Sequence, residues 1–169
     1  MNPILEQIQK LGIVPVVVIN DAEKAEALAK AFTDGGLPCA EVTFRTAAAE
    51  EAIKRMTQAF PDMLVGAGTV VTIEQAEKAV KAGAKFLVSP GYDQLLVDWA
   101  KEHNVPNFPG VATASELQVA VRNGFSILKF FPAEAAGGLK MTVHGLVYDM
   151  TAKAAKEAAL GAGGIIHYV

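Results

Sequence analysis

The 169-residue sequence contains a single cysteine, Cys39, so it can form no disulfide bond within the chain. One free thiol suits a reducing compartment, and we expect a cytoplasmic protein. No apolar run is long enough to span a bilayer, and the start MNPILEQIQK lacks the basic and apolar parts of a secretion signal, so no membrane partner is expected. The formal net charge of −3 offers no basic field to attract nucleic acid.

Two common phosphate-binding motifs, GxGxxG and GxxxxGK[ST], are also missing. The three histidines, His103, His144 and His167, have no metal-ligand spacing, so we expect surface or capping roles for them and no metal site. Apolar residues dominate the composition: 51% of the residues are hydrophobic and 20% are charged. This composition is typical of one compact domain, here expected to span residues 1–169.

Apolar runs alternate with amphipathic segments along most of the chain. Six runs predict strands, and they begin at Ile13 (IVPVVVI), Pro38 (PCAEVTF), Met63 (MLVGAGT), Lys85 (KFLVSP), Val105 (VPNFPG) and Ser126 (SILKFF). Five Ala-rich segments between them predict helices over 21–34, 47–58, 73–82, 93–103 and 114–122. Caps are expected at Asn20-Asp21, Thr46, Thr72 and Thr113, and glycines should end helices at 34–36, 82–84 and 123–125.

Continuously apolar strands joined by helices indicate an α/β protein with parallel pairing. The regular spacing favours a (β/α)8 TIM-type barrel over a doubly wound sheet, which usually has a break where the strand order reverses. Six βα units are clear, and the last two must be short, incomplete or rearranged. For residues 139–148 we prefer a helix to the alternative of a seventh strand over 141–148. A helix over 151–160 and a last strand at IIHYV (165–169) should follow.

Polar residues interrupt three strands near their C-terminal ends, where barrel active sites lie. Glu41, Thr43 and Arg45 alternate, so they should share one face of the second strand. The third run ends in GAGT, so Thr69 lies beside backbone that Gly66 and Gly68 leave without side chains. Lys129 lies in the apolar run SILKFF.

Imine formation is the chemistry that needs such a set. A lysine attacks a ketone as the free amine, which apolar surroundings and a nearby cation such as Arg45 would favour. Arg45 could also hold a substrate carboxylate, and Glu41 could move protons as a general acid–base. The structural alternative is that Glu41 merely neutralises Lys129 or Arg45. Cys39 should lie on the same inward face as Glu41, one layer nearer the start of the strand, as a small apolar filler.

Five ordered motifs resemble those of the 2-keto-3-deoxy-6-phosphogluconate (KDPG) / 4-hydroxy-2-oxoglutarate (KHG) aldolases. They are EVTFRT (41–46), VGAGTV (65–70), SPG (89–91), PNFPGVATASE (106–116) and LKFFPAE (128–134), and the similarity runs over about residues 10–140. The resemblance implies a homotrimeric class I aldolase on a TIM barrel, a lyase of carbohydrate metabolism that needs no metal or other cofactor. It would cleave KDPG to pyruvate and glyceraldehyde 3-phosphate, or KHG to pyruvate and glyoxylate.

The resemblance also implies a role for each matching residue. Lys129 matches the Schiff-base lysine and Glu41 the general acid–base. Arg45 and Thr69 match residues that hold the pyruvyl carboxylate, whereas Pro90 and Phe131 match the pocket wall.

The tail, residues 141–169, departs from the family pattern. The family continues into strands ending in PTGGI and GGSW, whose glycine-rich turns bind the substrate phosphate, as barrel sites after strands seven and eight generally do. Gly163 and Gly164 echo GGI weakly and are the candidate phosphate-binding residues. The chain therefore resembles a truncated, spliced or engineered aldolase. The alternative function is a non-catalytic barrel scaffold without the phosphate site.

Overall fold

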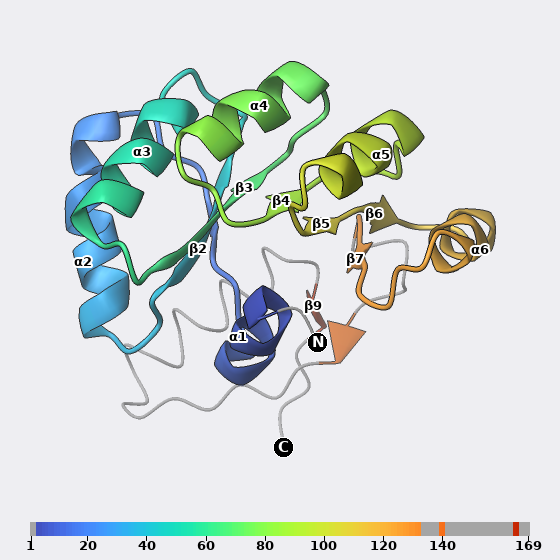
Figure 1. Cartoon of the computed structure of the whole chain (residues 1–169). Coiled ribbons are helices and arrows are strands. Elements are labelled where there is room, and N and C mark those ends of the chain that lie inside the picture. Colours follow the sequence, from blue (N-terminus) through green and yellow to red (C-terminus); the bar gives the residue numbers. More distant parts are fainter. Residues whose placement is uncertain (1–2, 133–138, 141–163, 166–169) are drawn as a thin grey trace. The chain divides into compact units, whose positions relative to one another are not determined.

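A computed structural model describes residues 3–132, 139–140 and 164–165 (Figure 1). The chain forms two compact units. The first comprises Met1–Gly110 and Ser126–Lys129, and the second comprises Val111–Phe125 and Phe130–Val169. In the described residues, no helix combines the length and the apolar character needed to cross a membrane.

The first unit is built on a five-stranded parallel sheet with the strands in sequence order. The strands are β1 (Val16–Val17), β2 (Cys39–Thr43), β3 (Leu64–Gly68), β4 (Leu87–Val88) and β5 (Asn107–Phe108). All five lie within runs predicted as strands. Parallel neighbours in sequence order form the wall of a (β/α) barrel, because each helix returns the chain to the same end of the sheet.

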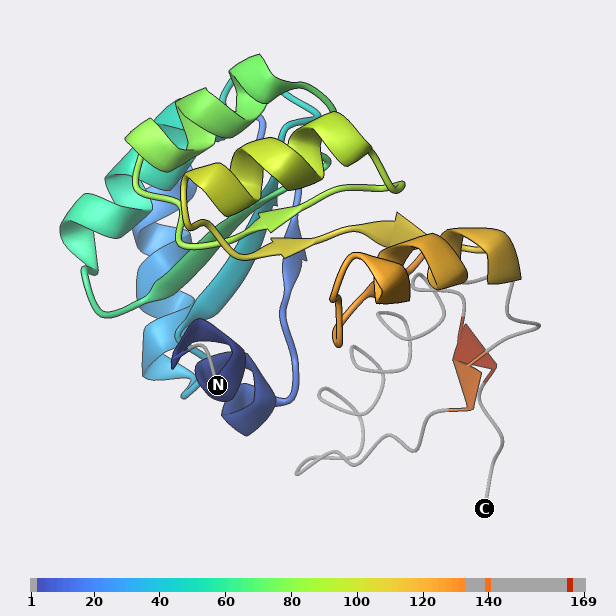
Figure 2. The ribbon, with the colours of Figure 1, turned by 45° about the vertical axis from the view of Figure 1, so that its right-hand side comes forward.

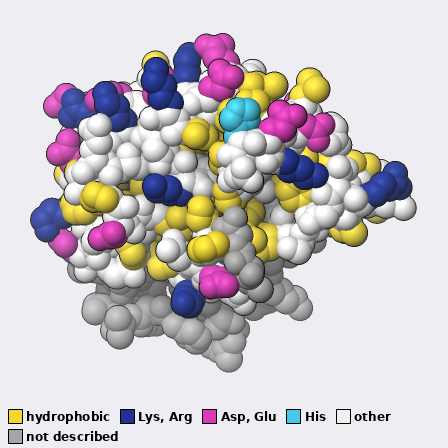
Figure 3. All heavy atoms as spheres, in the orientation of Figure 1, with side chains coloured by type: hydrophobic (Ala, Val, Ile, Leu, Met, Phe, Trp, Pro, Cys, Tyr) yellow, Lys and Arg dark blue, Asp and Glu magenta, His cyan; other side chains and the backbone are white. Residues whose placement is uncertain are grey.

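The helices of this unit are α1 (Pro3–Leu11), the 3₁₀ turn η1 (Ala22–Lys24), α2 (Ala25–Asp34), α3 (Ala49–Ala59), α4 (Ile73–Lys81) and α5 (Gln94–Glu102). Four of them, α2 to α5, cover one face of the sheet (Figures 1 and 2). Their buried alanines, such as Ala29 and Ala76, pack on strand residues that include Val42 and Leu87. Ion pairs cover their outward surface, for example the pair between Arg55 and Glu51 at 3.2 Å (Figure 3).

The helix ends mostly follow the sequence signals. The side chains of Asp21 and Thr72 accept hydrogen bonds from backbone amides in the first turns that follow them. The predicted cap at Thr46 is wrong, because α3 begins after Ala48 and the Thr46 hydroxyl instead donates to the Ile19 carbonyl at 2.5 Å. The Thr46 hydroxyl thus ties the segment after β2 to the segment after β1.

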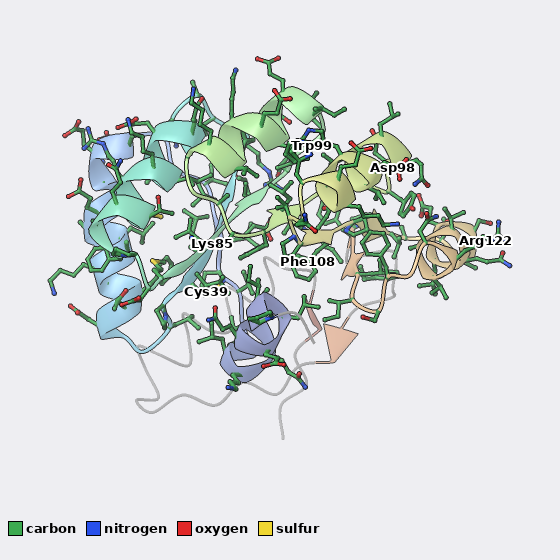
Figure 4. The ribbon with its side chains drawn as sticks, viewed as in Figure 1. Cys39, Lys85, Asp98, Trp99, Phe108 and Arg122 are labelled. Carbon is green, nitrogen blue, oxygen red and sulfur yellow. The ribbon has the colours of Figure 1, made fainter. Side chains whose placement is uncertain are left out.

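Helix α1 was not predicted, and it packs against the other face of the sheet. Its partly buried residues Ile4, Leu5 and Ile8 contact a cluster that contains Cys39, Leu64, Phe86, Val88 and Phe108. Figure 4 labels Cys39 and Phe108 on this side. The rings of Phe86 and Phe108 meet edge to face at 5.7 Å. Because successive side chains of a strand point to opposite faces, the core has two sides. One side lies against α2 to α5. The other, which faces α1, carries the polar residues.

The second unit contains α6 (Ala114–Arg122), which starts with a capping box between Thr113 and Glu116. It also contains two short parallel strands, β8 (Leu139–Lys140) and β9 (Gly164–Ile165), paired with Leu139 opposite Gly164. The predicted helix over 139–148 is thus wrong at residues 139–140, where ladder pairing replaces helical spacing. The strand expected from Ile165 is confirmed there. Residues 141–148, the helix expected over 151–160 and the remainder of IIHYV lie outside the described residues.

Two further strands, β6 (Gly110–Val111) and β7 (Lys129–Phe130), pair where the chain passes between the units. Within the first unit, the Lys129 amide donates to the Pro109 carbonyl at 3.1 Å. This bond extends the strand order by one and places Lys129 on the strand after β5. The sixth predicted strand is therefore confirmed.

Candidate active site

Glu41 lies in the middle of β2, between β1 and β3, with 5% of its surface exposed. It belongs to the same face as Cys39, which packs in the apolar layer above α1. Burying a carboxylate costs several kcal/mol unless a cation or hydrogen bonds compensate for the lost water. The position therefore needs a charged partner.

Lys129 provides that partner. Its Nζ lies 3.4 Å from Oε1 of Glu41, and 23% of the lysine side chain is exposed, against 6% for the glutamate side chain. The more exposed side chain of the pair is thus the lysine. The contact between Lys129 and Glu41 is compatible with both hypotheses from the sequence, the catalytic pair and the structural neutralisation of charge.

Arg45 and Thr69 form the second pair of the site. Arg45 follows the end of β2 and Thr69 follows the end of β3, and the Arg45 Nε donates to the Thr69 Oγ1 at 3.1 Å. The backbone of Thr69 has φ 55°, a left-handed conformation that is rare for a β-branched residue. Such outliers persist where neighbouring structure holds them, and they concentrate at functional sites. The hydroxyl hydrogen of Thr69 and the terminal nitrogens of Arg45 are donor types that suit a carboxylate.

Pro90 lies just after β4, in a turn fixed by close packing. The buried Ser89 hydroxyl donates to the Gly91 carbonyl at 2.9 Å and so spans the proline. At Gly110 a Cβ atom would lie 2.1 Å from the Pro90 carbonyl oxygen, so only glycine fits there. The bracing role of Ser89 was not predicted, although a serine before Pro-Gly is a common turn signal.

The remaining candidate residues fall in the second unit. Phe131 is 37% exposed, and its amide donates to the Val111 carbonyl at 3.1 Å. Gly164 lies in β9, whereas Gly163 is outside the described residues.

Thr43 and Cys39, the neighbours of Glu41 on its strand, have structural roles. The Thr43 hydroxyl is fully buried and donates to the Val17 carbonyl at 3.0 Å, which ties β2 to β1. Burial, and to a smaller degree the charge of Glu41, raises the pKa of Cys39 to about 11. The thiol therefore stays protonated at neutral pH and acts as the predicted apolar filler.

The histidine expectation can be checked at one position. His103 follows α5, its Nδ1 lies 2.8 Å from the Trp99 carbonyl, and its ring stacks on Trp99 at 4.1 Å. It is a capping residue, as predicted, while His144 and His167 lie outside the described residues. Across the described part of the chain, no three His, Cys, Asp or Glu side chains gather closely enough to hold a metal ion.

Comparisons with known proteins show which family the chain belongs to. The family model of KDPG and KHG aldolases matches residues 4–166. The chain belongs to this family. It is 47% identical over 141 residues to 2-dehydro-3-deoxy-phosphogluconate aldolase of Treponema pallidum, a match that covers 83% of this chain and 67% of the relative. In other relatives the match covers 64% and 65% of their length, so this chain spans about two thirds of the proteins that it resembles.

Solved structures of KDPG aldolases share the fold. One from Legionella pneumophila, with pyruvate captured as a covalent carbinolamine intermediate, has a TM-score of 0.71 at 44% identity, covering 75% of this chain and 61% of that one. One from Zymomonas mobilis, with 3-phosphoglycerate, has a TM-score of 0.76 at 34% identity, covering 98% of this chain and 73% of that one. The predicted α/β class of TIM-barrel type is therefore confirmed.

Proposed function

We propose that this chain is a class I aldolase that cleaves KDPG, or the related KHG, to pyruvate and an aldehyde. The observation that carries the proposal is the Lys129 amine, partly exposed and 3.4 Å from the nearly buried Glu41 carboxylate. An amine that bonds to a ketone and a carboxylate that moves protons beside it are the two groups that this reaction needs. Membership in the family, and a relative that holds pyruvate as a carbinolamine, support the same chemistry.

In this proposal Lys129 releases a proton to water, and its free amine adds to the C2 carbonyl of the substrate. The carbinolamine then takes up a proton and loses water, which leaves a protonated imine. Glu41 then accepts the proton of the C4 hydroxyl while the C3–C4 bond breaks. The electron pair of that bond moves toward the iminium nitrogen, so an aldehyde leaves and an enamine remains. A proton returns to C3, and water releases pyruvate and the free amine.

The other site residues position the pyruvyl group. Arg45 and Thr69, joined at 3.1 Å, would bind its carboxylate together, which fixes C2 near the amine. Pro90 and Phe131 are proposed to form apolar walls of the pocket, by analogy with the family. We also propose, on the same basis, a homotrimer located in the cytoplasm, and light scattering would measure the oligomer directly.

Trapping with pyruvate and borohydride tests the proposal. Reduction fixes the imine, so a mass increase of one reduced pyruvyl group is expected on the peptide that contains Lys129. Lys85, an exposed lysine just before β4, is an internal control for non-specific amine modification. Absence of the increase, or equal modification of Lys85, would favour the non-catalytic scaffold instead.

A further inference from the structure

Two glycines on β3 leave space for side chains from the neighbouring strands. In the register of the sheet, Gly66 lies opposite Glu41 and Gly68 lies opposite Thr43. A Cβ atom on Gly66 would lie 2.2 Å from the ring of Phe86, and one on Gly68 would lie 2.0 Å from Oε1 of Glu41. Each glycine is thus covered by one particular side chain.

The two contacts explain where the Glu41 carboxylate lies. The ring of Phe86 occupies the space over Gly66, directly across from Glu41. The glutamate instead leans one step along the strand and lies over Gly68, so its Cγ and Cδ would both be 2.6 Å from the added Cβ. This step points toward the C-terminal ends of the strands, where the Lys129 amine lies 3.4 Å from Oε1.

We propose that Gly68 is a positioning residue for catalysis. Because Gly68 has no side chain, it leaves a space, which we call the seat, that holds the Glu41 carboxylate against Lys129. The inference rests on the proposed function for its catalytic part. Its geometric part does not, because the contact between Gly68 and Glu41 exists whatever the chain catalyses.

The substitution Gly68→Ala should move the Glu41 carboxylate without removing it. The backbone of Gly68 does not have a positive φ, so alanine is compatible with its conformation. The added Cβ meets a flexible side chain rather than backbone. Ordinary contact begins at 3.4 Å, so Oε1 at 2.0 Å must move by at least about 1.4 Å. A misplacement of only about 1 Å can already cost about 100-fold in rate.

The first experiment follows imine formation and proton transfer separately. Pyruvate trapped by borohydride reports on Lys129, whereas exchange of the pyruvate methyl protons with deuterated water reports on the proton-transfer group. For Gly68→Ala we expect a 10- to 100-fold lower kcat for exchange, with KM for pyruvate and trapping at saturating pyruvate within about threefold of wild type. Unchanged kcat, or a rise in KM without a fall in kcat, overturns the positioning role.

Gly66→Ala is the matched control, because it adds the same methyl group to the same face of β3. There the methyl group meets the Phe86 ring rather than Glu41. It should lower the melting temperature without the selective loss of exchange. A selective loss equal to that of Gly68→Ala would mean that any overpacking of β3 has this effect, which contradicts the proposal.

The second experiment uses stability alone and needs no activity. The melting temperature is measured for Gly68→Ala in the wild-type and Glu41→Ala backgrounds. With Glu41 intact, the alanine should lower it. In Glu41→Ala the three clashing atoms are gone, so replacing a glycine whose φ is not positive should be neutral or stabilising.

The outcomes of the two experiments are distinguishable. If wild type neither traps nor exchanges, the proposed function fails, while the melting cycle still tests the seat. An equal loss of melting temperature in both backgrounds overturns the inference. If Gly68→Ala fails to fold but folds together with Glu41→Ala, the contact is supported.

Discussion

The Nζ of Lys129 and Oε1 of Glu41 lie 3.4 Å apart, although 88 positions separate the two residues in the chain. The two side chains form an ion pair in which the glutamate side chain is 6% exposed and the lysine side chain 23%. Catalysis and structural pairing both use this contact. They differ in what removal of one partner should do to turnover and to stability.

Replacing Glu41 by glutamine keeps the shape of the side chain and removes its capacity to accept a proton. We expect pyruvate binding and trapping to persist while kcat falls by about 100- to 10,000-fold, the usual contribution of a general acid–base. Steady-state kinetics with KDPG would measure this. Glu77→Gln, an exposed change on α4, is the control for loss of a negative charge. A Glu41→Gln variant with unchanged kcat and a lower melting temperature would make Glu41 a structural counter-ion.

Arginine at position 129 would keep a cation beside Glu41 but could not form an imine. Lys129→Ala would also remove the nucleophile, yet it would leave the buried Glu41 without this cation and so confuse loss of activity with loss of stability. For Lys129→Arg we expect trapping to disappear and the melting temperature to stay near that of wild type. Lys85→Arg, at an exposed position, should trap normally. Undiminished trapping in Lys129→Arg would show that another lysine forms the imine.

Much of the fold could be predicted because each strand and helix carries its own signal. The runs around Cys39–Thr43 and Leu64–Gly68 are mostly apolar and are buried throughout, and Thr72 and Thr113 cap the helices that follow them. Helix α1 was missed although its apolar residues have helical spacing, and the structure shows that these residues pack against the far face of the sheet.

The sequence indicates which residues form the candidate site, but it does not predict how their side chains are arranged. Polar residues inside apolar strands identify Glu41 and Lys129 without a structure. Glu41 lies over Gly68, whereas the ring of Phe86, which comes just before β4, fills the space over Gly66. Contacts of this kind arise from packing between segments that are distant in the sequence, so no local sequence pattern predicts them. Thr46 failed as a cap for the same reason, since its partner Ile19 belongs to another part of the chain.

The buried thiol of Cys39 makes stability depend on alkaline pH. Its pKa is raised from the usual 9.0 to about 11, so between these values the unfolded chain has lost a proton that the folded chain keeps. The free energy of unfolding should therefore fall as pH rises from about 9 to about 11. Thermal melts of wild type and Cys39→Ala across this range would measure the difference. The alanine variant should melt lower at pH 7 but lose less with rising pH, and parallel slopes would contradict the burial of an un-ionised thiol.

From the sequence, the tail 141–169 is expected to depart from the family's glycine-rich motifs PTGGI and GGSW, so the site for the substrate phosphate is expected to be missing. Contacts to phosphate are charge-assisted, so losing them should cost several kcal/mol of transition-state binding. We expect low activity with little preference for KDPG over its unphosphorylated analogue. The ratio of their kcat/KM values measures this. A preference of about a thousandfold, or about 4 kcal/mol, would require an anion site, with Gly163 and Gly164 or a partner chain as its candidates.

The left-handed backbone of Thr69 predicts opposite effects of one substitution on stability and on binding. A left-handed conformation costs an ordinary residue roughly 1–2 kcal/mol, and a glycine adopts it freely at an entropic cost of roughly 0.5–1 kcal/mol. From the backbone alone, Thr69→Gly should therefore raise the free energy of unfolding by between about 0 and 1.5 kcal/mol. It also removes the hydroxyl that meets Arg45, and hydrogen bonds to charged groups contribute about 1.5–3 kcal/mol, so KM for pyruvate should rise about 10-fold or more. Asn104, with φ 54° beyond the end of α5, is the matched control. Asparagine tolerates this conformation, so Asn104→Gly should change the melting temperature little and leave KM unchanged. A Thr69→Gly variant that binds pyruvate as wild type does would show that the strained threonine serves the backbone and not the substrate.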